Sequence, residues 1–298
     1  MTASLGLGTY KVRVAAQAAR TACSQGATWI DTAPNYLDGP GHRDLAAVLD
    51  LHPRVRVSTK TGFIHRDQRK AAVASGVITD QAAATGHSLA PPFVRWQTAR
   101  SLACLGRADV VFVHNPERAG DDRNTVHAAL REAFTVLEEF AQAGRIGGYG
   151  VATWYGFDTR AFTVPELGAL ARDAGGPGHH LRAIQLPVSL VMARPIALAL
   201  DGRGPLAQAH AAGLLTFGSS PLHGGELPDL VTPALADFIR PGTSPAEASL
   251  LAAASCPSLD VVLLSASTSD RWHTALNATG SPLSPDQLRK VIDVLAQG

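Results

Sequence analysis

The sequence predicts an α/β protein that folds as a single-domain (β/α)8 (TIM) barrel over residues 1–298. Short apolar runs alternate with segments of helical periodicity from one end of the chain to the other. The runs number eight, which is the number of parallel strands that closes such a barrel. No linker or low-complexity segment divides the chain, and barrels of this kind commonly take this much chain as one domain.

The candidate strands are rich in Val, Ile or Leu and are bounded by Gly, Pro or Asn, as is typical of buried parallel strands. They are residues 4–9, 28–32, 55–60, 109–114, 147–152, 183–187, 214–219 and 260–265. An open dinucleotide-binding sheet is the competing fold, because Gly6 and Gly8 in LGLGTY suggest a phosphate loop. They lack its GxGxxG spacing, so the barrel is favoured.

Residues 122–144 form the clearest helix, with Asp121 or Asp122 as its cap and Gly144 as its stop. Its apolar positions recur every three or four residues: Val126, Leu130, Phe134, Leu137 and Phe140. Two adjacent prolines at 91–92 begin another helix.

Ser284 and Pro285 give the start signal of the last helix, residues 288–296. Three longer stretches without clear periodicity follow strand ends, where loops of a barrel surround the active-site mouth. They are residues 62–88, 189–204 and 220–243, and they are the predicted substrate walls.

Composition limits the class of partner. The chain is 46% hydrophobic and 17% charged, with a net charge of +1, so nothing favours binding to nucleic acid or to a membrane surface. Three scattered cysteines form no CxxC pair, which predicts a reducing compartment and no metal site. No apolar run reaches the roughly 20 residues of a membrane-spanning helix. We expect a soluble cytoplasmic protein with a small-molecule substrate, either a monomer or a small homo-oligomer.

Four residues with chemically useful side chains lie where apolar runs end: Asp31 and Tyr36 in IDTAPNY, Lys60 in VRVSTK and His114 in VVFVHN. The carboxyl ends of parallel strands meet at one face of a barrel, so these side chains should converge. Lys60 is also one of only four lysines in the chain, among many arginines.

Together these groups fit proton transfer to a carbonyl. A phenol with a pKa of about 10 is a poor acid or base at neutral pH. A lysine ammonium beside Tyr36 lowers that pKa, and Asp31 fixes the position and charge of Lys60. His114 then orients or polarises the carbonyl oxygen. A hydride donor beside that carbonyl would complete a reductase.

Each residue also has a structural interpretation. An Asp after a strand often caps a helix, a Tyr in a loop is often half-buried, and a His beside Asn115 can satisfy backbone groups. Lys60 is harder to explain in this way, because a buried ammonium needs a partner. All four structural interpretations would have to hold at the same barrel face.

The sequence resembles the aldo-keto reductase superfamily. The matching motifs occur in order along nearly the whole chain: GLGTY, IDTAPNY, STKTG, VVFVHNPE, GVATW, IQLP, GSSPL and STSDRWHTALN. The resemblance implies a (β/α)8 barrel and NAD(P)H-dependent reduction of aldehydes or ketones, or the reverse oxidation. It implies that Tyr36 is the general acid/base, that Lys60 and Asp31 tune it, and that His114 positions the carbonyl.

The same resemblance places the nicotinamide cofactor. Gln185 matches the family glutamine that binds the nicotinamide amide, and Thr153 stands where an asparagine is common. Ser219 stands where an aromatic residue often stacks on the nicotinamide. Ser220 and Leu222 fall in the segment that wraps the pyrophosphate.

The adenosine end departs from the family pattern. Ser265 replaces the lysine that would bind a 2′-phosphate, and a Glu-Asn pair downstream becomes Thr274-Ala275. Arg271 remains, and an arginine at a helix start is a good phosphate ligand. NADPH is therefore preferred, with NADH as the alternative and a solvated surface residue as the structural interpretation of Arg271.

The first strand begins almost at the first residue, so the hairpin that plugs the barrel bottom in relatives should be reduced or absent. Other residues must then close the bottom. Phe63, Trp154 and Tyr155 are the candidate substrate contacts, although Trp154 would be equally ordinary in a core.

Three functions fit this sequence. The first is an NAD(P)H-dependent reductase of a small aldehyde or ketone. The second is an NAD(P)⁺-dependent sugar or polyol dehydrogenase that works in the oxidative direction. The third is a non-redox or regulatory protein that keeps the barrel, which the altered segment LLSAS at the last strand would suit.

Overall fold

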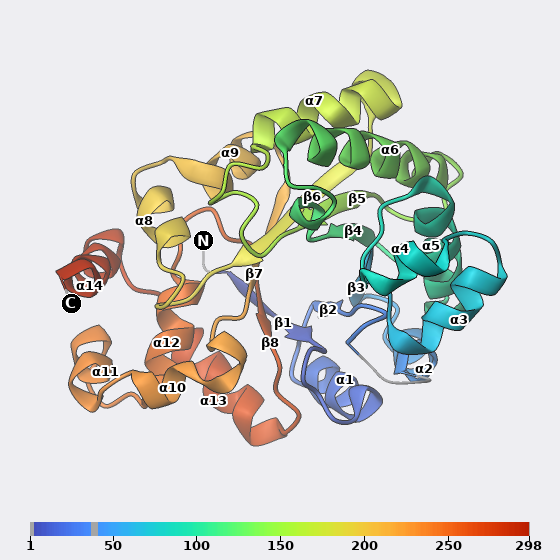
Figure 1. The fold of residues 1–298 in the computed structure, drawn as a ribbon. Helices are drawn as coiled ribbons and strands as arrows, with labels where there is room; N and C mark the ends of the chain where they lie inside the picture. The colour runs from blue at the N-terminus through green and yellow to red at the C-terminus, as the bar shows by residue number, and fades with distance from the viewer. Residues whose placement is uncertain (1–2, 37–40, 298) are drawn as a thin grey trace.

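Eight parallel strands form a closed barrel in chain order in the computed structural model, which describes residues 3–36 and 41–297 (Figure 1). The strands are β1 Ser4–Gly8, β2 Trp29–Asp31, β3 Arg56–Thr61, β4 Val110–His114, β5 Tyr149–Ala152, β6 Leu181–Pro187, β7 Leu215–Ser219 and β8 Val261–Leu264. Pairing of β1 with β8 closes the ring. Each predicted strand is confirmed, with ends that shift by one or two residues.

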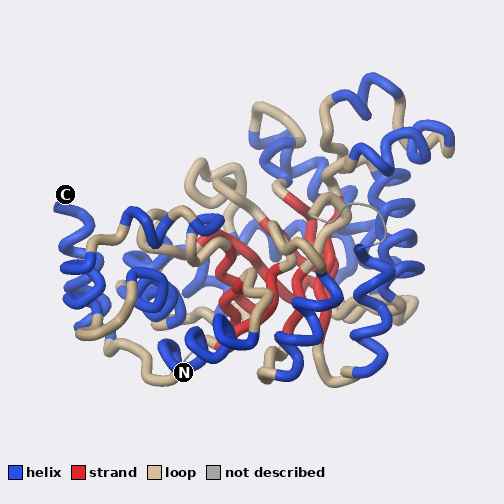
Figure 2. The backbone as a smooth tube through the Cα atoms, turned by 90° about the horizontal axis from the view of Figure 1, so that it is seen from below, coloured by secondary structure: helices blue, strands red, loops and turns tan. Residues whose placement is uncertain are grey.

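Helices surround the barrel on its outside, as the view from below shows (Figure 2). The longer ones are α1 Ala15–Ser24, α2 Gly41–Leu51, α5 Pro91–Leu105, α6 Arg123–Gln142, α7 Val164–Gly175, α12 Pro245–Ala254, α13 Ser269–Thr279 and α14 Pro285–Gln297. Asp122 is the cap of α6, since its side chain accepts the backbone N–H groups of Asn124 and Thr125. None of the helices in the described ranges is both long and apolar enough to cross a membrane.

The three stretches predicted as loops contain short helices, so that prediction was incomplete. They are α3 Arg66–Ala74, α4 Asp80–Ala84, α8 Arg194–Leu200, α10 Leu227–Leu230 and α11 Pro233–Ile239, with the 3₁₀ turn η3 His223–Gly225. Beyond these stretches lie α9 Gly204–Ala211, which begins at the last residue of the second one, and the 3₁₀ turns η1 Pro116–Arg118 and η2 Gly176–Gly178. Several of these helices depend on local caps, such as Thr79 for α4 and Thr232 for α11. Helices this short carry too few apolar positions to give a periodic signal.

The barrel interior is layered. Its apolar layer is formed by Trp29, Val110, Phe112, Ala152, Ala183, Phe217, Val261 and Leu263. Side chains in a strand alternate between two faces, so the residue two positions after an inward one also points inward. Following this rule, Asp31 comes after Trp29, His114 after Phe112, and Gln185 after Ala183. The strands thus hold a polar layer above an apolar one.

Trp29 and Arg56 cover the bottom of the barrel, where they are paired as the first residues of β2 and β3. Trp29 is 1% exposed, and its ring meets the edge of Phe217 with centroids 4.9 Å apart. The Arg56 guanidinium lies 4.5 Å from the Trp29 ring centroid. Trp29 and Arg56 therefore close the bottom of the barrel, as expected if the N-terminal hairpin is reduced or absent.

Candidate active site

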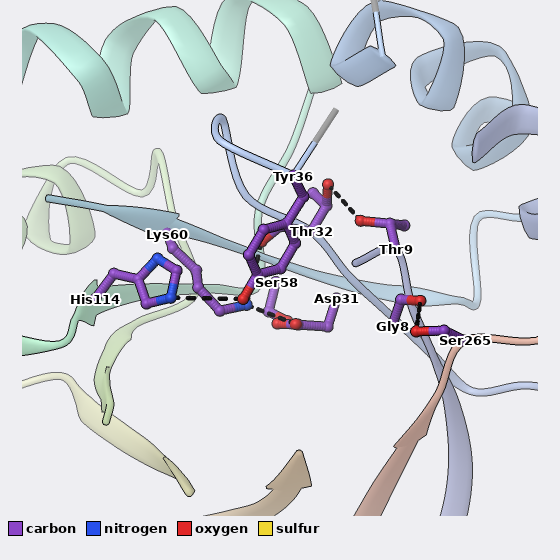
Figure 3. Close-up of polar contacts among 9 residues, drawn as sticks. All are labelled: Gly8, Thr9, Asp31, Thr32, Tyr36, Ser58, Lys60, His114 and Ser265. Atoms are coloured by element: carbon purple, nitrogen blue, oxygen red, sulfur yellow. Dashed lines mark hydrogen bonds and ion pairs between the residues drawn. The ribbon is translucent and has the colours of Figure 1, made fainter. Parts of the chain in front are cut away.

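The four predicted catalytic side chains come together at the carboxyl ends of the strands (Figure 3). Asp31 is the last residue of β2, His114 is the last residue of β4, and Lys60 lies near the end of β3. Tyr36 lies in the turn that follows β2. The convergence predicted from strand ends is therefore confirmed as geometry.

Asp31 and Lys60 form a buried ion pair beneath the tyrosine. The Lys60 Nζ lies 2.5 Å from the Asp31 Oδ2, and the two side chains are 1% and 4% exposed. Lys60 also donates to the carbonyl oxygen of Thr32 at 3.3 Å. Burial lowers the pKa of Lys60, and the neighbouring Asp31 carboxylate opposes that shift. The pair is consequently a fixed, internally compensated charge at the floor of the site.

Ser58 completes this pair, although the sequence argument did not include it. Its Oγ donates to the Asp31 Oδ1 at 2.7 Å, so both carboxylate oxygens are engaged. Ser58 pairs directly with Asp31 in the β2–β3 register, and it lies two residues before Lys60 on the same face of β3. That spacing of two residues is the signal that would have identified it.

Tyr36 faces His114 across the site. The Tyr36 hydroxyl lies 3.5 Å from the His114 Nε2, and the Lys60 Nζ lies 4.9 Å from the Tyr36 ring centroid. Tyr10 packs beside them, with its ring centroid 5.2 Å from that of Tyr36. The hydroxyl and the imidazole nitrogen thus bound one small space in which a carbonyl oxygen can contact both.

The sequence predicted a lowered pKa for Tyr36, but the net shift in this structure is upward. Burial raises the pKa of Tyr36 well above its ordinary value, and the charge of Asp31 and the phenol of Tyr10 raise it further. The positive charge of Lys60 is compensated by Asp31, which limits its effect on the phenol. Tyr36 therefore holds its proton throughout the neutral range.

His114 is uncharged and firmly held. Burial lowers its pKa well below the ordinary value, and the nearby Lys60 and His87 lower it further. The Phe63 ring packs edge-on against the imidazole with centroids 4.7 Å apart. His87 donates its Nε2–H to the His114 carbonyl oxygen at 2.8 Å. Burial lowers the pKa of His87 to about 4, so this second imidazole is also neutral.

His87 was missed because its neighbourhood carries no motif. It lies in the stretch between β3 and α5, and a bridge to Phe63 and the hydrogen bond to the His114 carbonyl oxygen place it beside the site. Sequence spacing alone gives no reason to place it there.

An elongated cavity of about 830 Å³ begins at Tyr36 and His114 and extends to the start of α13. Asp270, Arg271 and Thr274 line that far end. The volume lies within the range of ligand sites, roughly 300–1,000 Å³. The cavity thus connects a proton-transfer site with a charged helix start.

The predicted cofactor residues line this cavity. Gln185 is 3% exposed, and its Nε2 has no hydrogen-bond partner, which leaves a buried donor for an amide such as that of nicotinamide. Thr153 accepts the Gly156 N–H at 2.8 Å through its Oγ1 and keeps its hydroxyl proton to donate. Ser219, Ser220 and Leu222 also line the wall. The donor set fits a nicotinamide cofactor.

At the far end, Ser265 and Arg271 both line the cavity but are engaged differently. Ser265 donates to the Gly8 carbonyl oxygen at 2.8 Å, so its hydroxyl ties β8 to β1 (Figure 3). Arg271 lies in the first turn of α13, and the carboxylate of Asp270 lies beside it in the lining. This end therefore presents a cation and an anion together.

Lys11 lies at the cavity wall, opposite the segment after β7. Its Nζ donates to the Gly224 carbonyl oxygen at 3.2 Å, which links the β1 and β7 loops. Lys11 is one of the four lysines of the chain, and its sequence context does not predict a place at the site. Its contact depends on two loops 213 residues apart, which no local pattern reveals.

The candidate substrate contacts do not share one cavity. Phe63 and Trp154 line the main cavity, whereas Tyr155 lines a second cavity of about 290 Å³ that Trp154 also borders. Trp154 is 40% exposed, so its interpretation as a core residue is wrong. Trp154 therefore borders both cavities with a partly exposed side chain.

Comparison with known proteins agrees with this geometry. Residues 2–161 match the model of the aldo/keto reductase family. The fold is similar to that of an aldo-keto reductase from Bacillus halodurans in its holo form, with 16% identity, a TM-score of 0.72, and coverage of 99% of this chain and 92% of that chain.

Two further solved structures are similar over nearly the whole chain. An aldo-keto reductase from Klebsiella pneumoniae in complex with NADPH has 18% identity, a TM-score of 0.66, and coverage of 99% of this chain and 95% of that chain. The glycerol dehydrogenase from Gluconobacter oxydans has 17% identity, a TM-score of 0.71, and coverage of 98% and 91%. At these identities the structures show a shared fold. No protein of curated function matches the sequence.

The family match covers more than half of the chain, and it confirms the resemblance drawn from the sequence motifs. The chain belongs to the aldo/keto reductase family and is an NAD(P)-dependent oxidoreductase that acts on carbonyl or alcohol substrates.

Proposed function

We propose that this protein uses NADPH to reduce a small aldehyde or ketone to the alcohol, with Tyr36 as the general acid. One observation carries the proposal: the Tyr36 hydroxyl lies 3.5 Å from the His114 Nε2, above the buried Asp31–Lys60 pair. A carbonyl oxygen between the hydroxyl and the imidazole can accept a hydrogen bond from each. Polarisation of the carbonyl by two donors lowers the barrier to attack at its carbon.

Tyr36 gives its proton to the carbonyl oxygen as that oxygen gains negative charge. Burial raises the pKa of Tyr36, so the phenol is protonated at neutral pH and its proton is available for donation. The Lys60 ammonium stabilises the phenolate that remains, and the Asp31 carboxylate keeps the ammonium in place. His114 stays neutral and can donate from Nε2 only as that tautomer.

The nicotinamide ring, when bound, supplies the hydride that reduces the carbonyl carbon. Gln185 and Thr153 would hold its carboxamide, because the Gln185 Nε2 is an unpaired buried donor and Thr153 keeps a hydroxyl proton. Ser219, Ser220 and Leu222 would line the path toward α13.

NADPH is proposed over NADH because Arg271 lines the adenosine end of the cavity. Asp270 opposes this preference, since a carboxylate repels a 2′-phosphate. The variants R271A and D270N separate the two effects. R271A should raise the KM for NADPH about tenfold and leave the KM for NADH nearly unchanged. D270N should lower the KM for NADPH. Equal effects of R271A on both cofactors would contradict the assignment of NADPH.

Oxidation of an alcohol is the second candidate function. It is suggested by the similar fold of a glycerol dehydrogenase. Oxidation requires Tyr36 to act as a base, and the same side chain can serve both directions because they share one transition state. Turnover of polyols with NADP⁺ that exceeds carbonyl reduction at neutral pH would reverse the proposed direction.

The variant Y36F tests the role of Tyr36. It removes the donor and keeps the ring, so we expect kcat to fall by a factor of about 10² to 10⁴ for carbonyl reduction. NADPH binding, followed by the nicotinamide fluorescence, should persist. If the wild type binds neither nicotinamide at micromolar concentration, the non-redox alternative takes precedence. Y36F turnover equal to the wild type would reject Tyr36 as the acid.

A further inference from the structure

The short turn after β5 is held by side-chain oxygens instead of by neighbouring strands. The backbone N–H groups of Trp154 and Tyr155 both donate to the Glu117 Oε1, at 3.0 and 3.2 Å. The next N–H, that of Gly156, donates to the Thr153 Oγ1 at 2.8 Å. Three successive backbone donors are thus satisfied by one carboxylate and one hydroxyl.

Glu117 is a buried carboxylate with one oxygen that has no hydrogen-bond partner. It is 8% exposed and lies in η1, three residues after His114. Its second carboxylate oxygen, Oε2, is buried and has no hydrogen-bond partner. A buried carboxylate is costly, and a single oxygen shared by two donors does not satisfy it fully. Packing alone would be served better by an apolar side chain of similar size.

The turn that Glu117 holds carries the wall between the two cavities. Trp154 borders both the main cavity and the smaller one, and its ring has few restraints of its own because it is 40% exposed. Its nearest aromatic contact is His223, with ring centroids 6.3 Å apart. The position of the indole therefore depends on the backbone beneath it, and Glu117 fixes that backbone.

Glu117 also connects this wall to the proton-transfer site. Asn115, directly after His114, donates its N–H to the Ala152 carbonyl oxygen at 2.6 Å, which continues the β4–β5 pairing beyond the strand ends. Glu117 continues the link by two further contacts to the same neighbouring segment. The distance from His114 to the Trp154 indole is consequently set by a short, rigid path.

We infer that Glu117 is a positioning residue that fixes the Trp154 side chain as the specificity wall of the substrate site. It does not line the main cavity, so it acts through Trp154 and not by contact with substrate. The wall matters most for substrates whose bodies reach the indole, such as aromatic aldehydes. Short aliphatic aldehydes need only the groups at Tyr36 and His114. The inference rests on the proposed carbonyl reduction.

Two variants of Glu117 test this role. E117L removes both acceptor oxygens and keeps the bulk, whereas E117Q keeps an amide oxygen that accepts the same two N–H groups. With 4-nitrobenzaldehyde, E117L should raise KM about tenfold, and E117Q should restore most of that loss. With propanal, the increase in KM for E117L should be several times smaller.

Glu138 supplies the matched control. It is a carboxylate on α6 with 2% side-chain exposure, and it accepts the His180 backbone N–H at 3.0 Å, next to the start of β6 and so at the other end of the barrel. E138L should lower the urea midpoint of unfolding and leave the ratio of the two KM values as in the wild type. A ratio that changes as much in E138L as in E117L would mean general destabilisation and would overturn the inference.

A double-mutant cycle with Trp154 tests the route of the effect. If Glu117 acts through the indole, E117L should not raise the aromatic KM further in a W154A background. Full additivity of the two effects would show that Glu117 acts elsewhere.

Hydrogen exchange gives a readout that needs no turnover. The amides of Trp154 and Tyr155 should exchange at least about tenfold faster in E117L than in E117Q, because they lose their acceptor. If the wild type reduces neither aldehyde, the proposed function fails while this measurement still tests Glu117. Unchanged exchange in E117L would reject the positioning role, whatever the activity.

Discussion

For Lys60, the sequence predicts the position of the side chain correctly but does not predict the net pKa of the neighbouring Tyr36. A lysine at the end of an apolar strand needs a buried partner, and Asp31 lies 2.5 Å away. The consequence for Tyr36 depended on how far that pairing compensates the lysine charge. Compensation is a matter of distance and burial, which the sequence does not contain.

The residues that were missed share one property. Ser58, His87 and Glu117 contact the site through partners that lie 27 to 38 residues away along the chain. Ser58 could have been found from strand alternation, because it lies on the face of Lys60. His87 and Glu117 sit in irregular segments, where no periodicity relates a side chain to its contacts.

The pKa shifts in the site predict an asymmetric pH profile for carbonyl reduction. His114 is neutral well below its ordinary pKa, and Tyr36 stays protonated well above neutrality, so kcat/KM should be flat between about pH 6 and 8. Burial lowers the pKa of Lys60, so its charge is lost on the alkaline side earlier than for a free lysine. Loss of that charge leaves Asp31 unpaired and weakens the acid.

Steady-state kinetics with a carbonyl substrate at constant ionic strength would measure this profile. The variant K60M, which lacks the charge at every pH, should lose the alkaline limb along with most of its activity. An acid limb centred near pH 6.5 that disappears in H114Q would show that His114 titrates in its ordinary range, against the structure.

At the scale of elements, the segment between β3 and α5 is a small helical unit with its own core. Ala72, Ile78, Ala83 and Phe93 form a buried cluster separate from the main one. The sequence predicted this segment as a loop around the mouth, and its position was right. The sequence did not predict the helices α3 and α4, because both are short and neither has a long apolar stripe. They pack against the small cluster of this unit.

Gln97 on α5 fastens that unit to the barrel. It is fully buried, its Oε1 accepts the Thr61 hydroxyl and the Gly62 N–H at 3.0 and 2.9 Å, and its Nε2 donates to the Phe63 carbonyl oxygen at 2.7 Å. The variant Q97L leaves these three partners without a hydrogen bond from residue 97. We expect a loss of about 3 kcal/mol in the free energy of unfolding.

Urea unfolding measures that loss, and limited proteolysis should locate the first cleavage within residues 62–89. Gln68 gives the control. Its Oε1 accepts one hydrogen bond from the Gln97 Nε2 at 2.9 Å, and its side chain is half-buried. Q68A should cost less than about 1 kcal/mol. Equal stability of Q97L and the wild type would show that the unit is held by packing alone.

At the scale of the whole molecule, the fold followed from the sequence more completely than the site did. Strand count and order came from short apolar runs, because burial on both faces forces that composition on each parallel strand. Closure of the barrel follows from the count of eight, whereas the plug at the bottom does not. Trp29 and Arg56 occupy that position through a stacking contact between two strand starts, and no motif marks it.

Trp29 should therefore support the stability of the whole barrel. It is one of the largest fully buried side chains and contacts Phe217 across the interior. W29A should lower the free energy of unfolding by about 3 to 5 kcal/mol, through the lost burial and the cavity that remains. W154A serves as the comparison, since Trp154 is 40% exposed and should cost much less. A W29A protein as stable as W154A would mean that the barrel does not rely on this plug.

The two-residue alternation within the strands has a consequence for how such a protein can change. Lys60 faces inward only because β3 pairs Ser58 with Asp31, and its neighbours Thr59 and Thr61 face the opposite way. Insertion of a single residue upstream in β3 would exchange these faces, so that an ammonium would enter the layer of helices and a threonine would replace it in the site. Loops at the mouth can lengthen or shorten freely during evolution. A gain or loss of one residue in β3 would move Lys60 out of the site and abolish the proposed chemistry, whereas a change of length in a loop at the mouth leaves the strand faces unaltered.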